Sequence, residues 1–260
     1  MSENCNHNCE NCSENCAQRD PKSFLEAPNA LSSIKKVVAV SSGKGGVGKS
    51  SVTAMLAVLL SRRGLKVGVL DADITGPSIP RAFGIKRKAR GSEMGILPEE
   101  TAMGIKVMSI NLLLEHEDQP VVWRGPILAG AVTQFWTDVA WGELDVLLID
   151  MPPGTGDVPL TVYQSLAVDG TIVVSTPQSL VQMVVGKAKK MADMLSIPVL
   201  GMVENMSYAV CPDCGRRIEL FGTPEGLEQA AAEMGVPLLT RLPMTPDVAR
   251  LCDEGEIERV

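Results

Sequence analysis

The chain has 260 residues, and its 45% hydrophobic content suits one α/β domain with short appendages and a sizeable core. Its net charge of −7 and 3% aromatic content argue against a nucleic-acid partner, because phosphate contacts need clustered Lys and Arg and base stacking needs aromatic rings. No apolar run approaches the ~20 residues that span a bilayer, and the polar N-terminus is unlike a secretory signal. We therefore expect a cytoplasmic protein that binds neither nucleic acid nor membrane.

A glycine-rich turn stands between an apolar β-branched run at residues 37–40 and a helix-forming stretch at residues 52–60. The turn carries Gly43-x4-Gly48-Lys49-Ser50, which is the P-loop pattern in its required strand–loop–helix setting. Such a loop brings backbone N–H groups to phosphate oxygens, while its lysine supplies charge and its hydroxyl binds Mg²⁺. The sequence predicts a nucleotide site, with a plain glycine turn as the alternative. The residues expected to bind the nucleotide here are Gly43, Lys44, Gly45, Gly46, Val47, Gly48, Lys49, Ser50 and Ser51.

Two further apolar runs end in carboxylates. Residues 66–70 lead to Asp71 and Asp73, and residues 146–149 lead to Asp150. Carboxylates at strand ends beside a phosphate loop hold Mg²⁺ or orient the attacking water. We expect Asp150 to act as a Walker B residue and Asp71 to be structural, with a helix cap as the alternative for Asp71 and Asp73. The expected magnesium-binding residues are Ser50, Asp73 and Asp150.

The seven cysteines are better interpreted as metal ligands or core thiols than as disulfides if the compartment is reducing. Four of them, Cys5, Cys9, Cys12 and Cys16, lie in a polar segment with no apolar residue to anchor it. Four thiolates on one metal centre would supply the energy to order such a segment. An iron–sulfur cubane and a tetrahedral zinc both fit, and a disordered tail is the alternative. The expected domains are a metal-binding segment at 1–19, a linker at 20–34 and an ATPase domain at 35–260.

A second cysteine motif, Cys211-x2-Cys214, is expected in a loop. Two thiolates fill only half of a four-ligand metal site. A two-fold homodimer would bring the same pair from each subunit to the axis and complete the set. A zinc knuckle that lacks its second half and a thiol redox pair are the alternatives.

The remaining elements alternate between strand and helix patterns. This alternation predicts an α/β fold with a mostly parallel twisted sheet and helices on both faces. Strands are expected at 105–113, 170–175, 198–203 and 237–242. Helices are expected at 125–141, at 179–195 with Ser179 as N-cap, at 227–234 and at 245–252. A charged loop is expected at 83–98.

Lys44 is a second lysine directly after the first glycine of the P-loop. In this respect the sequence resembles the deviant Walker A ATPases, the group that contains MinD, ParA and the nitrogenase iron protein. The resemblance implies that Lys44 reaches across a dimer interface to the partner's nucleotide, with catalysis shared by Lys44, Lys49 and Asp73. It also implies that Asn205 contacts the adenine edge. A solvent-directed Lys44 and a turn-capping Asn205 are the alternatives.

Several stretches together resemble the Mrp/ApbC subfamily of ATP-binding iron–sulfur cluster carriers over about residues 35–250. They are Gly76-Pro-Ser-Ile-Pro-Arg81, Val122-Trp-Arg-Gly-Pro126, Asp150-Met-Pro-Pro-Gly-Thr-Gly-Asp157 and Val203-Glu-Asn-Met-Ser-Tyr208 followed by the Cys211–Cys214 pair. The resemblance implies ATP binding and hydrolysis, a [4Fe–4S] cluster bridged between two subunits through Cys211 and Cys214, and transfer of that cluster to apoproteins. We expect the segment after Asp150 to carry the nucleotide state to the cysteine loop. The alternative is a ParA/MinD-type regulator whose cysteines hold structural zinc.

Overall fold

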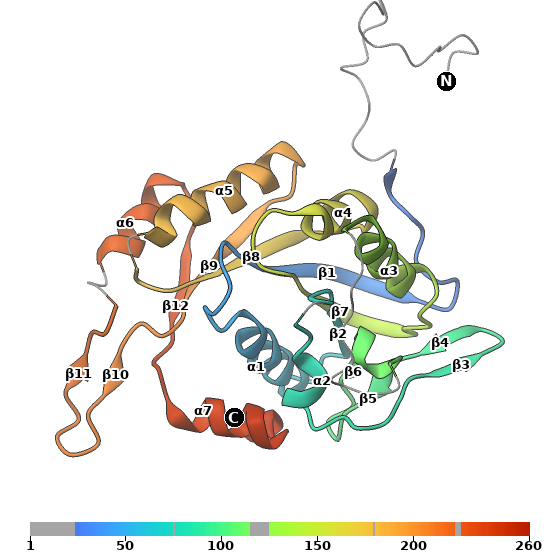
Figure 1. Ribbon diagram of the computed structural model, residues 1–260, viewed down its shortest axis with the longest axis horizontal. Helices are drawn as coiled ribbons and strands as arrows, with labels where there is room; N and C mark the ends of the chain where they lie inside the picture. Colours follow the sequence, from blue (N-terminus) through green and yellow to red (C-terminus); the bar gives the residue numbers. More distant parts are fainter. Residues whose placement is uncertain (1–23, 75, 115–124, 179, 222–224) are drawn as a thin grey trace, which may run out of the picture.

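The computed structural model describes residues 24–74, 76–114, 125–178, 180–221 and 225–260. These residues form an eight-stranded sheet in the order β12-β9-β8-β1-β7-β2-β6-β5 (Figure 1). Neighbouring strands are parallel except β5 and β6, which are antiparallel. The bounds are β1 Ser33–Ser42, β2 Val67–Asp71, β5 Glu99–Glu100, β6 Lys106–Met108, β7 Glu143–Asp150, β8 Gly170–Ser175, β9 Val199–Glu204 and β12 Leu238–Arg241. The predicted fold class is confirmed.

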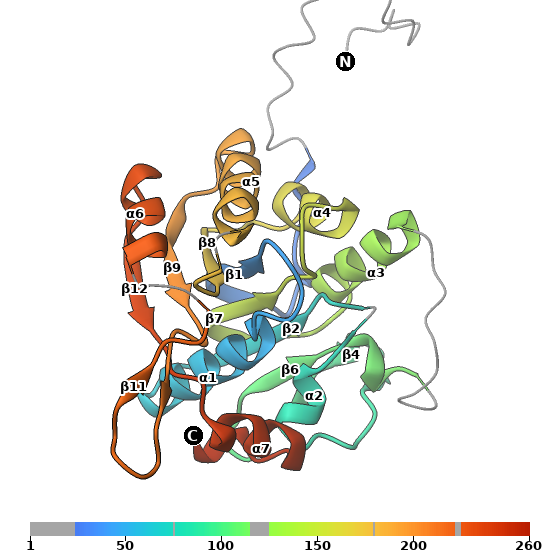
Figure 2. The ribbon, with the colours of Figure 1, turned by 60° about the vertical axis from the view of Figure 1, so that its left-hand side comes forward.

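Helices cover both faces of this sheet (Figures 1 and 2). One face carries α1 Lys49–Arg62, α2 Ile79–Ala82 and α7 Pro246–Glu254, and the other carries α3 Gly125–Thr137, α4 Asp157–Ser165, α5 Leu180–Met194 and α6 Glu225–Glu233. Separate apolar clusters lie on the two sides, one built around Phe135 and Tyr163 and the other around Ala57 and Leu251. Because both faces are covered, the central strands are continuous apolar runs rather than alternating ones.

The position of β1 determines where the site forms. β1 lies between β7 and β8, and β7 pairs in turn with β2. The parallel register places Val40 beside Asp150 and Asp150 beside Asp71. Since the strands run in the same direction, the turn after β1 and the carboxylates that end β7 and β2 meet at one edge of the sheet.

Three elements differ from the sequence-based expectation. The expected strand at 105–113 is β6 only and is followed by the 3₁₀ turn Ile110–Leu112, because pairing of β6 with β2 ends at Met108. The expected helix at 125–141 ends at Thr137, and Ala140 instead donates a backbone hydrogen bond to Ile96. The expected charged loop at 83–98 contains an antiparallel hairpin, β3 Arg90–Ser92 and β4 Gly95–Leu97.

The segment before β1 lies against α3 and α4. The Glu26 N–H donates to the Ser165 carbonyl at 2.8 Å, and the Trp136 indole donates to the Glu26 carbonyl at 2.9 Å. β1 begins at Ser33, two residues before the boundary expected between linker and ATPase domain. The four N-terminal cysteines, and Ser179 as N-cap, lie outside the described residues, so these assignments stay predictions.

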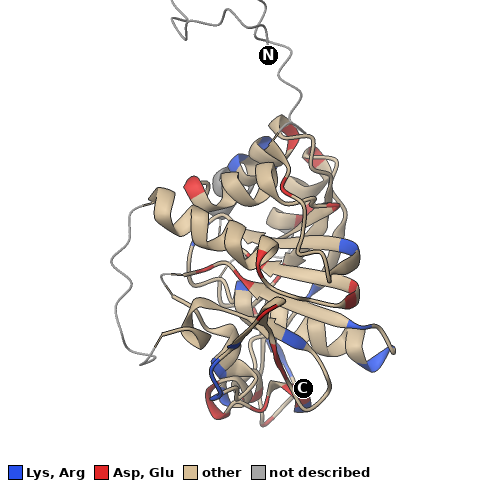
Figure 3. Ribbon diagram, turned by 90° about the vertical axis from the view of Figure 1, so that its right-hand side faces the viewer, with Lys and Arg blue, Asp and Glu red and all other residues tan. Residues whose placement is uncertain are grey.

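Lys and Arg are mixed with Asp and Glu over the side of the molecule that Figure 3 displays. Several form exposed ion pairs between neighbouring strand ends, such as Lys35 with Asp145 and Lys66 with Glu143. Within the described ranges, no helix combines the length and the apolar character needed to cross a bilayer.

Candidate functional site

The P-loop connects β1 to α1 and requires glycine at Gly48. This residue has φ +75°, and its carbonyl accepts the first hydrogen bond of α1, from the Val52 N–H at 3.0 Å. A Cβ atom at Gly48 would stand 2.3 Å from the Asn205 side-chain nitrogen. The loop therefore delivers the N-terminus of α1, with its free N–H groups, to a small open cleft, which is a ready anion site.

That cleft has a volume of about 210 Å³. Its walls include eight of the nine P-loop residues expected to bind nucleotide, from Lys44 to Ser51; Gly43 lies just before them. Asp73 lines the cleft from the segment after β2. Ser42 and Pro153 also line it and were missed by sequence reasoning, although each neighbours a motif that was recognised.

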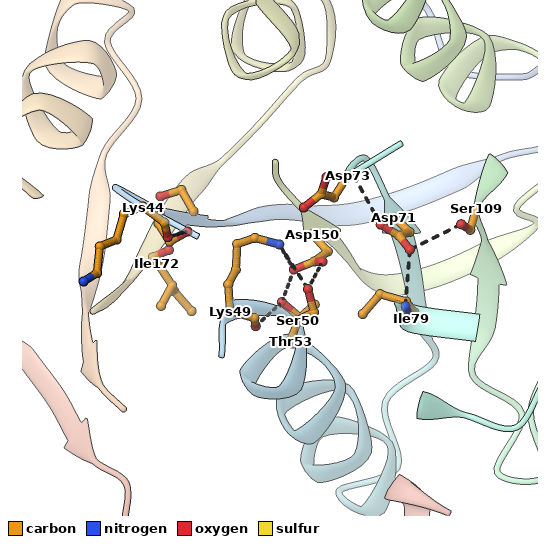
Figure 4. Close-up of polar contacts among 12 residues, drawn as sticks. Lys44, Lys49, Ser50, Thr53, Asp71, Asp73, Ile79, Ser109, Asp150 and Ile172 are labelled. Carbon is orange, nitrogen blue, oxygen red and sulfur yellow. Dashed lines mark hydrogen bonds and ion pairs between the residues drawn. The ribbon is translucent and has the colours of Figure 1, made fainter. Parts of the chain in front are cut away.

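Asp150 is the centre of a buried polar cluster that includes Lys49 and Ser50 from the wall of the cleft (Figure 4). Its carboxylate lies 2.7 Å from Lys49 Nζ and accepts hydrogen bonds from Ser50 Oγ at 2.6 Å and Thr53 Oγ1 at 2.8 Å. Lys49 and Asp150 are almost completely buried. Lys49 is expected to contact phosphate and Ser50 to bind Mg²⁺. In this structure both side chains contact the carboxylate of Asp150 instead. Thr53, one turn into α1, was missed by sequence reasoning because threonine in a helix gives no distinctive signal.

Asp71 and Asp73 occupy different environments. Asp71 is fully buried and accepts hydrogen bonds from the Ile79 N–H and the Ser109 hydroxyl, both at 3.3 Å. Burial, followed by the neighbouring Asp150 charge, raises the pKa of Asp71 to about 8. Asp73 instead faces the open cleft. The geometry therefore gives Asp71 a structural position beneath the site and leaves Asp73 accessible to water, nucleotide and metal.

Lys44 is turned away from Lys49, as Figure 4 shows. Its ammonium group donates a hydrogen bond to the side-chain oxygen of Gln178, which lies in the connection between β8 and α5. Both residues are half-buried. Gln178 lies 134 positions from Lys44 in sequence, and no local pattern pointed to it.

A larger cavity of about 490 Å³ adjoins the P-loop on the side of Gly48 and Ser51. Asn205, expected at an adenine edge, lines this cavity. Its side-chain nitrogen also donates a 2.9 Å hydrogen bond to the Val47 carbonyl. Asn205, the residue directly after β9, thus holds the P-loop by this hydrogen bond while it lines the cavity.

The cysteine motif forms the tip of a second hairpin, β10 Ala209–Val210 and β11 Arg217–Ile218. Two backbone hydrogen bonds close the tip, from the Cys211 N–H to the Arg216 carbonyl and from the Gly215 N–H to the Cys211 carbonyl, both 2.9 Å. The N–H groups of Cys214 and Asp213 point at the Cys211 sulfur and lower the pKa of its thiol. Donors of this kind stabilise the thiolate form that binds metals.

The hairpin presents the two thiols to the outside. Cys211 is half-buried and Cys214 is exposed. Among the described residues, no cluster of three or more His, Cys, Asp or Glu side chains could hold a metal ion. The pair therefore fits half of a four-thiolate site and needs ligands from elsewhere.

A family model described as ParA, NUBPL iron-transfer P-loop NTPase matches residues 33–259, from the start of β1 to the final 3₁₀ turn. The chain belongs to this family. The resemblance to iron–sulfur cluster carriers inferred from sequence is confirmed by curated relatives. An iron-sulfur cluster carrier protein of Clostridium perfringens is 48% identical, covering 86% of this chain and 81% of that one. The carrier of Methanocaldococcus jannaschii is 46% identical, with 96% and 89% covered.

Solved structures extend the comparison. A nucleotide-binding protein of Archaeoglobus fulgidus in complex with ADP matches with a TM-score of 0.77 and 49% identity, covering 86% of this chain and 88% of that chain. The cell division ATPase MinD of Pyrococcus furiosus matches with a TM-score of 0.59 and 22% identity, covering 86% and 90%. At that identity the likeness to MinD concerns the fold alone.

Proposed function

We propose that this protein binds and hydrolyses ATP with Mg²⁺, and that two copies carry a [4Fe–4S] cluster between them and pass it to apoproteins. The observation that carries the proposal is the cysteine hairpin. Its thiols are accessible, and backbone N–H groups favour the Cys211 thiolate, yet the described part of the chain offers no third ligand. An exposed, incomplete thiolate site suits a cargo that must be released.

This ligand count supports homodimerisation. An isologous two-fold interface would place Cys211 and Cys214 of both copies around one cluster. The same dimer would let Lys44 leave Gln178 and reach the partner's nucleotide. Membership in an iron-transfer family, and relatives named iron–sulfur cluster carriers, support this reading over a regulator with structural zinc.

The cleft residues fit a nucleotide with magnesium. Oxygen ligands suit Mg²⁺, and Ser50, Asp73 and Asp150 supply them at one edge of the sheet. The metal, when bound, would neutralise charge on the phosphates. Lys49 would exchange its contact with Asp150 for phosphate oxygens, and Asp73 would orient the attacking water. Phosphoryl transfer needs positioning and charge more than a strong base, and these residues suit both needs.

Anaerobic reconstitution with iron and sulfide tests the proposal. We expect Cys211→Ala to lose the bridging cluster, measured as iron, sulfide and charge-transfer absorption, and to lose cluster transfer to an apoprotein. Cys252→Ala is the matched control, because Cys252 lies in α7 outside the hairpin. The same measurements in a Cys5→Ala background remove one of the predicted N-terminal ligands, so that metal bound there is separated from metal bound at Cys211 and Cys214. Zinc without iron or sulfide at Cys211 and Cys214, or a monomer that stays monomeric with ATP, would contradict the proposal.

The compartment stays a prediction. Relatives include an iron-sulfur protein of Arabidopsis thaliana described as mitochondrial, which is 43% identical over 86% of this chain and 72% of that one. For this chain the cytoplasm remains our proposal.

A further inference from the structure

The large cavity beside the P-loop has walls from distant parts of the chain. Gly48 and Ser51 form the side toward the phosphate cleft. Ala209 and Val210, which make up strand β10 of the cysteine hairpin, form another wall. The P-loop and the cysteine hairpin therefore border the same space.

The size and lining of the cavity suit the nucleoside part of a nucleotide. Its volume of about 490 Å³ is within the usual range of small-molecule sites, ~300–1,000 Å³. Met55, Met206 and Leu242 give it an apolar lining, and methionine sulfur packs well against flat aromatic rings. Because the cavity shares Gly48 and Ser51 with the phosphate cleft, one nucleotide can occupy both.

Only a few residues separate the contact with the P-loop from Cys211, the first cysteine of the hairpin. Asn205 holds the Val47 carbonyl, and Cys211 follows only six positions later. Met206, directly after Asn205, has φ +55°, a left-handed conformation that side chains other than glycine rarely adopt. Such a residue persists only where its surroundings hold it, so the backbone here is set by contacts at both ends.

The base of the hairpin is also hydrogen-bonded to another wall of the cavity. The Ser207 N–H donates to the Leu242 carbonyl at 2.9 Å, and the Met244 N–H donates to the Tyr208 carbonyl at 2.7 Å. Leu242 and Met244 belong to the connection between β12 and α7, which lines the cavity. These bonds link the hairpin base directly to a wall of the cavity.

We propose that the base of the bound nucleotide, packed against Ala209 and Val210, directly orients the hairpin that carries Cys211 and Cys214. Ala209 and Val210 are then positioning residues for cluster binding and delivery. The inference rests on the proposed function for the role of the hairpin. It differs from the expected route through the segment after Asp150, because no residue of that segment lines the cavity in the described part of the chain.

Hydrogen exchange on the full-length, metal-free protein tests this inference. ADP and pyrophosphate, each with Mg²⁺, both carry the diphosphate, but only ADP carries a base. We expect both to protect the P-loop amides at 43–50, which reports occupancy. Only ADP should slow exchange in the hairpin amides at 209–218, by about five-fold or more. The β3–β4 hairpin at 90–97 serves as an internal control that neither compound protects.

A pair of variants within the hairpin sharpens the test. Val210 and Ile218 are similarly exposed, at 50% and 44%, and lie on opposite strands, but only Val210 lines the cavity. Val210→Ala should reduce the ADP effect on the hairpin, whereas Ile218→Ala should retain it. Unchanged protection of β7 amides would verify that both variants are folded.

Two results would overturn the inference. One is equal hairpin protection by ADP and pyrophosphate, which would assign the signal to the phosphates. The other is no hairpin protection by ADP while the P-loop is occupied. Either result, with cluster assembly and transfer intact, would leave the proposed function standing. Failure to assemble a cluster while ADP still protects the hairpin would remove the proposed function and leave the link between nucleotide and hairpin.

Discussion

Lys49 Nζ lies 2.7 Å from the carboxylate of Asp150, and the two side chains are only 5% and 0% exposed. A buried ion pair of this kind contributes little net stability, yet breaking it is costly because the remaining charge has no partner. A nucleotide that recruits Lys49 must therefore supply Asp150 with a substitute cation. Magnesium bound by Ser50 and Asp150 would do so, which links nucleotide binding to metal binding in one step.

The first prediction concerns Lys49→Ala without nucleotide. We expect a loss of about 3–5 kcal/mol in the free energy of unfolding, since Asp150 is left charged and buried. Urea denaturation measures it. Lys35→Ala is the control, because the pair of Lys35 with Asp145 has the same 2.7 Å distance but a lysine side chain that is 75% exposed. That change should cost less than about 1 kcal/mol. Equal losses in the two variants would contradict the role given to burial.

The second prediction concerns the hydrogen bond between Lys44 and Gln178. If Lys44 acts across the dimer, this bond must break when ATP brings two copies together. Gln178→Ala removes that cost in both copies, and two hydrogen bonds worth about 1 kcal/mol each correspond to roughly thirty-fold tighter ATP-dependent dimerisation. Sedimentation with ATP measures the dissociation constant.

A double-mutant cycle isolates the effect of this bond. In a Lys44→Ala background, which lacks the donor, Gln178→Ala should change the dimerisation constant no further. Tighter association from Gln178→Ala regardless of Lys44 would assign the effect to the interface surface instead.

The third prediction uses Asp71, whose pKa rises from 3.8 to about 8 in the fold because of burial and then Asp150. The folded protein holds this proton while the unfolded chain releases it. The stability contributed by Asp71 is therefore present below pH ~4 and is lost as the pH rises toward about 8. In metal-free protein, wild type should lose stability relative to Asp71→Asn between pH 5 and pH 8. A difference between the two proteins that does not vary with pH would contradict the raised pKa.

The sequence predicted the parts of the site that local pattern determines. Gly43, Gly48, Lys49 and Ser50 lie within one short turn, and Asp150 ends an apolar run, so spacing and periodicity were enough to find them. The cavity that Gly48 and Val210 both line depends on how β9 and the following hairpin lie beside the P-loop. That arrangement follows from the order of β9, β8 and β1 in the sheet, which no window of sequence contains.

The elements that were predicted wrongly from the sequence also depend on contacts between distant parts of the chain. The helix expected to reach Trp141 stops at Thr137 because the following residues pair with Ile96, which lies some forty positions earlier in the chain. The β3–β4 hairpin was hidden because its strands are three residues long and charged or glycine-rich, so they lack the apolar alternation of a half-buried strand. In both cases the structure is set by backbone pairing between residues that a local sequence pattern does not connect.

The last prediction compares cysteine reactivity in the metal-free protein. Backbone N–H groups of Cys214 and Asp213 lower the pKa of Cys211, whereas burial raises the pKa of Cys252. Since the thiolate is the reactive form, iodoacetamide should modify Cys211 with a half-maximal pH below that of Cys252. Peptide mass spectrometry across a pH series gives both profiles.

Two substitutions at one position separate backbone from side chain in that experiment. Asp213→Ala keeps the N–H that points at the Cys211 sulfur, so the Cys211 profile should stay in place. Asp213→Pro deletes that N–H and should move the profile to higher pH. A shift produced equally by Asp213→Ala would mean that the carboxylate, not the backbone, sets the reactivity. Because the same donors stabilise a metal-bound thiolate, Asp213→Pro should also weaken iron retention at the hairpin while leaving nucleotide binding at the P-loop unchanged.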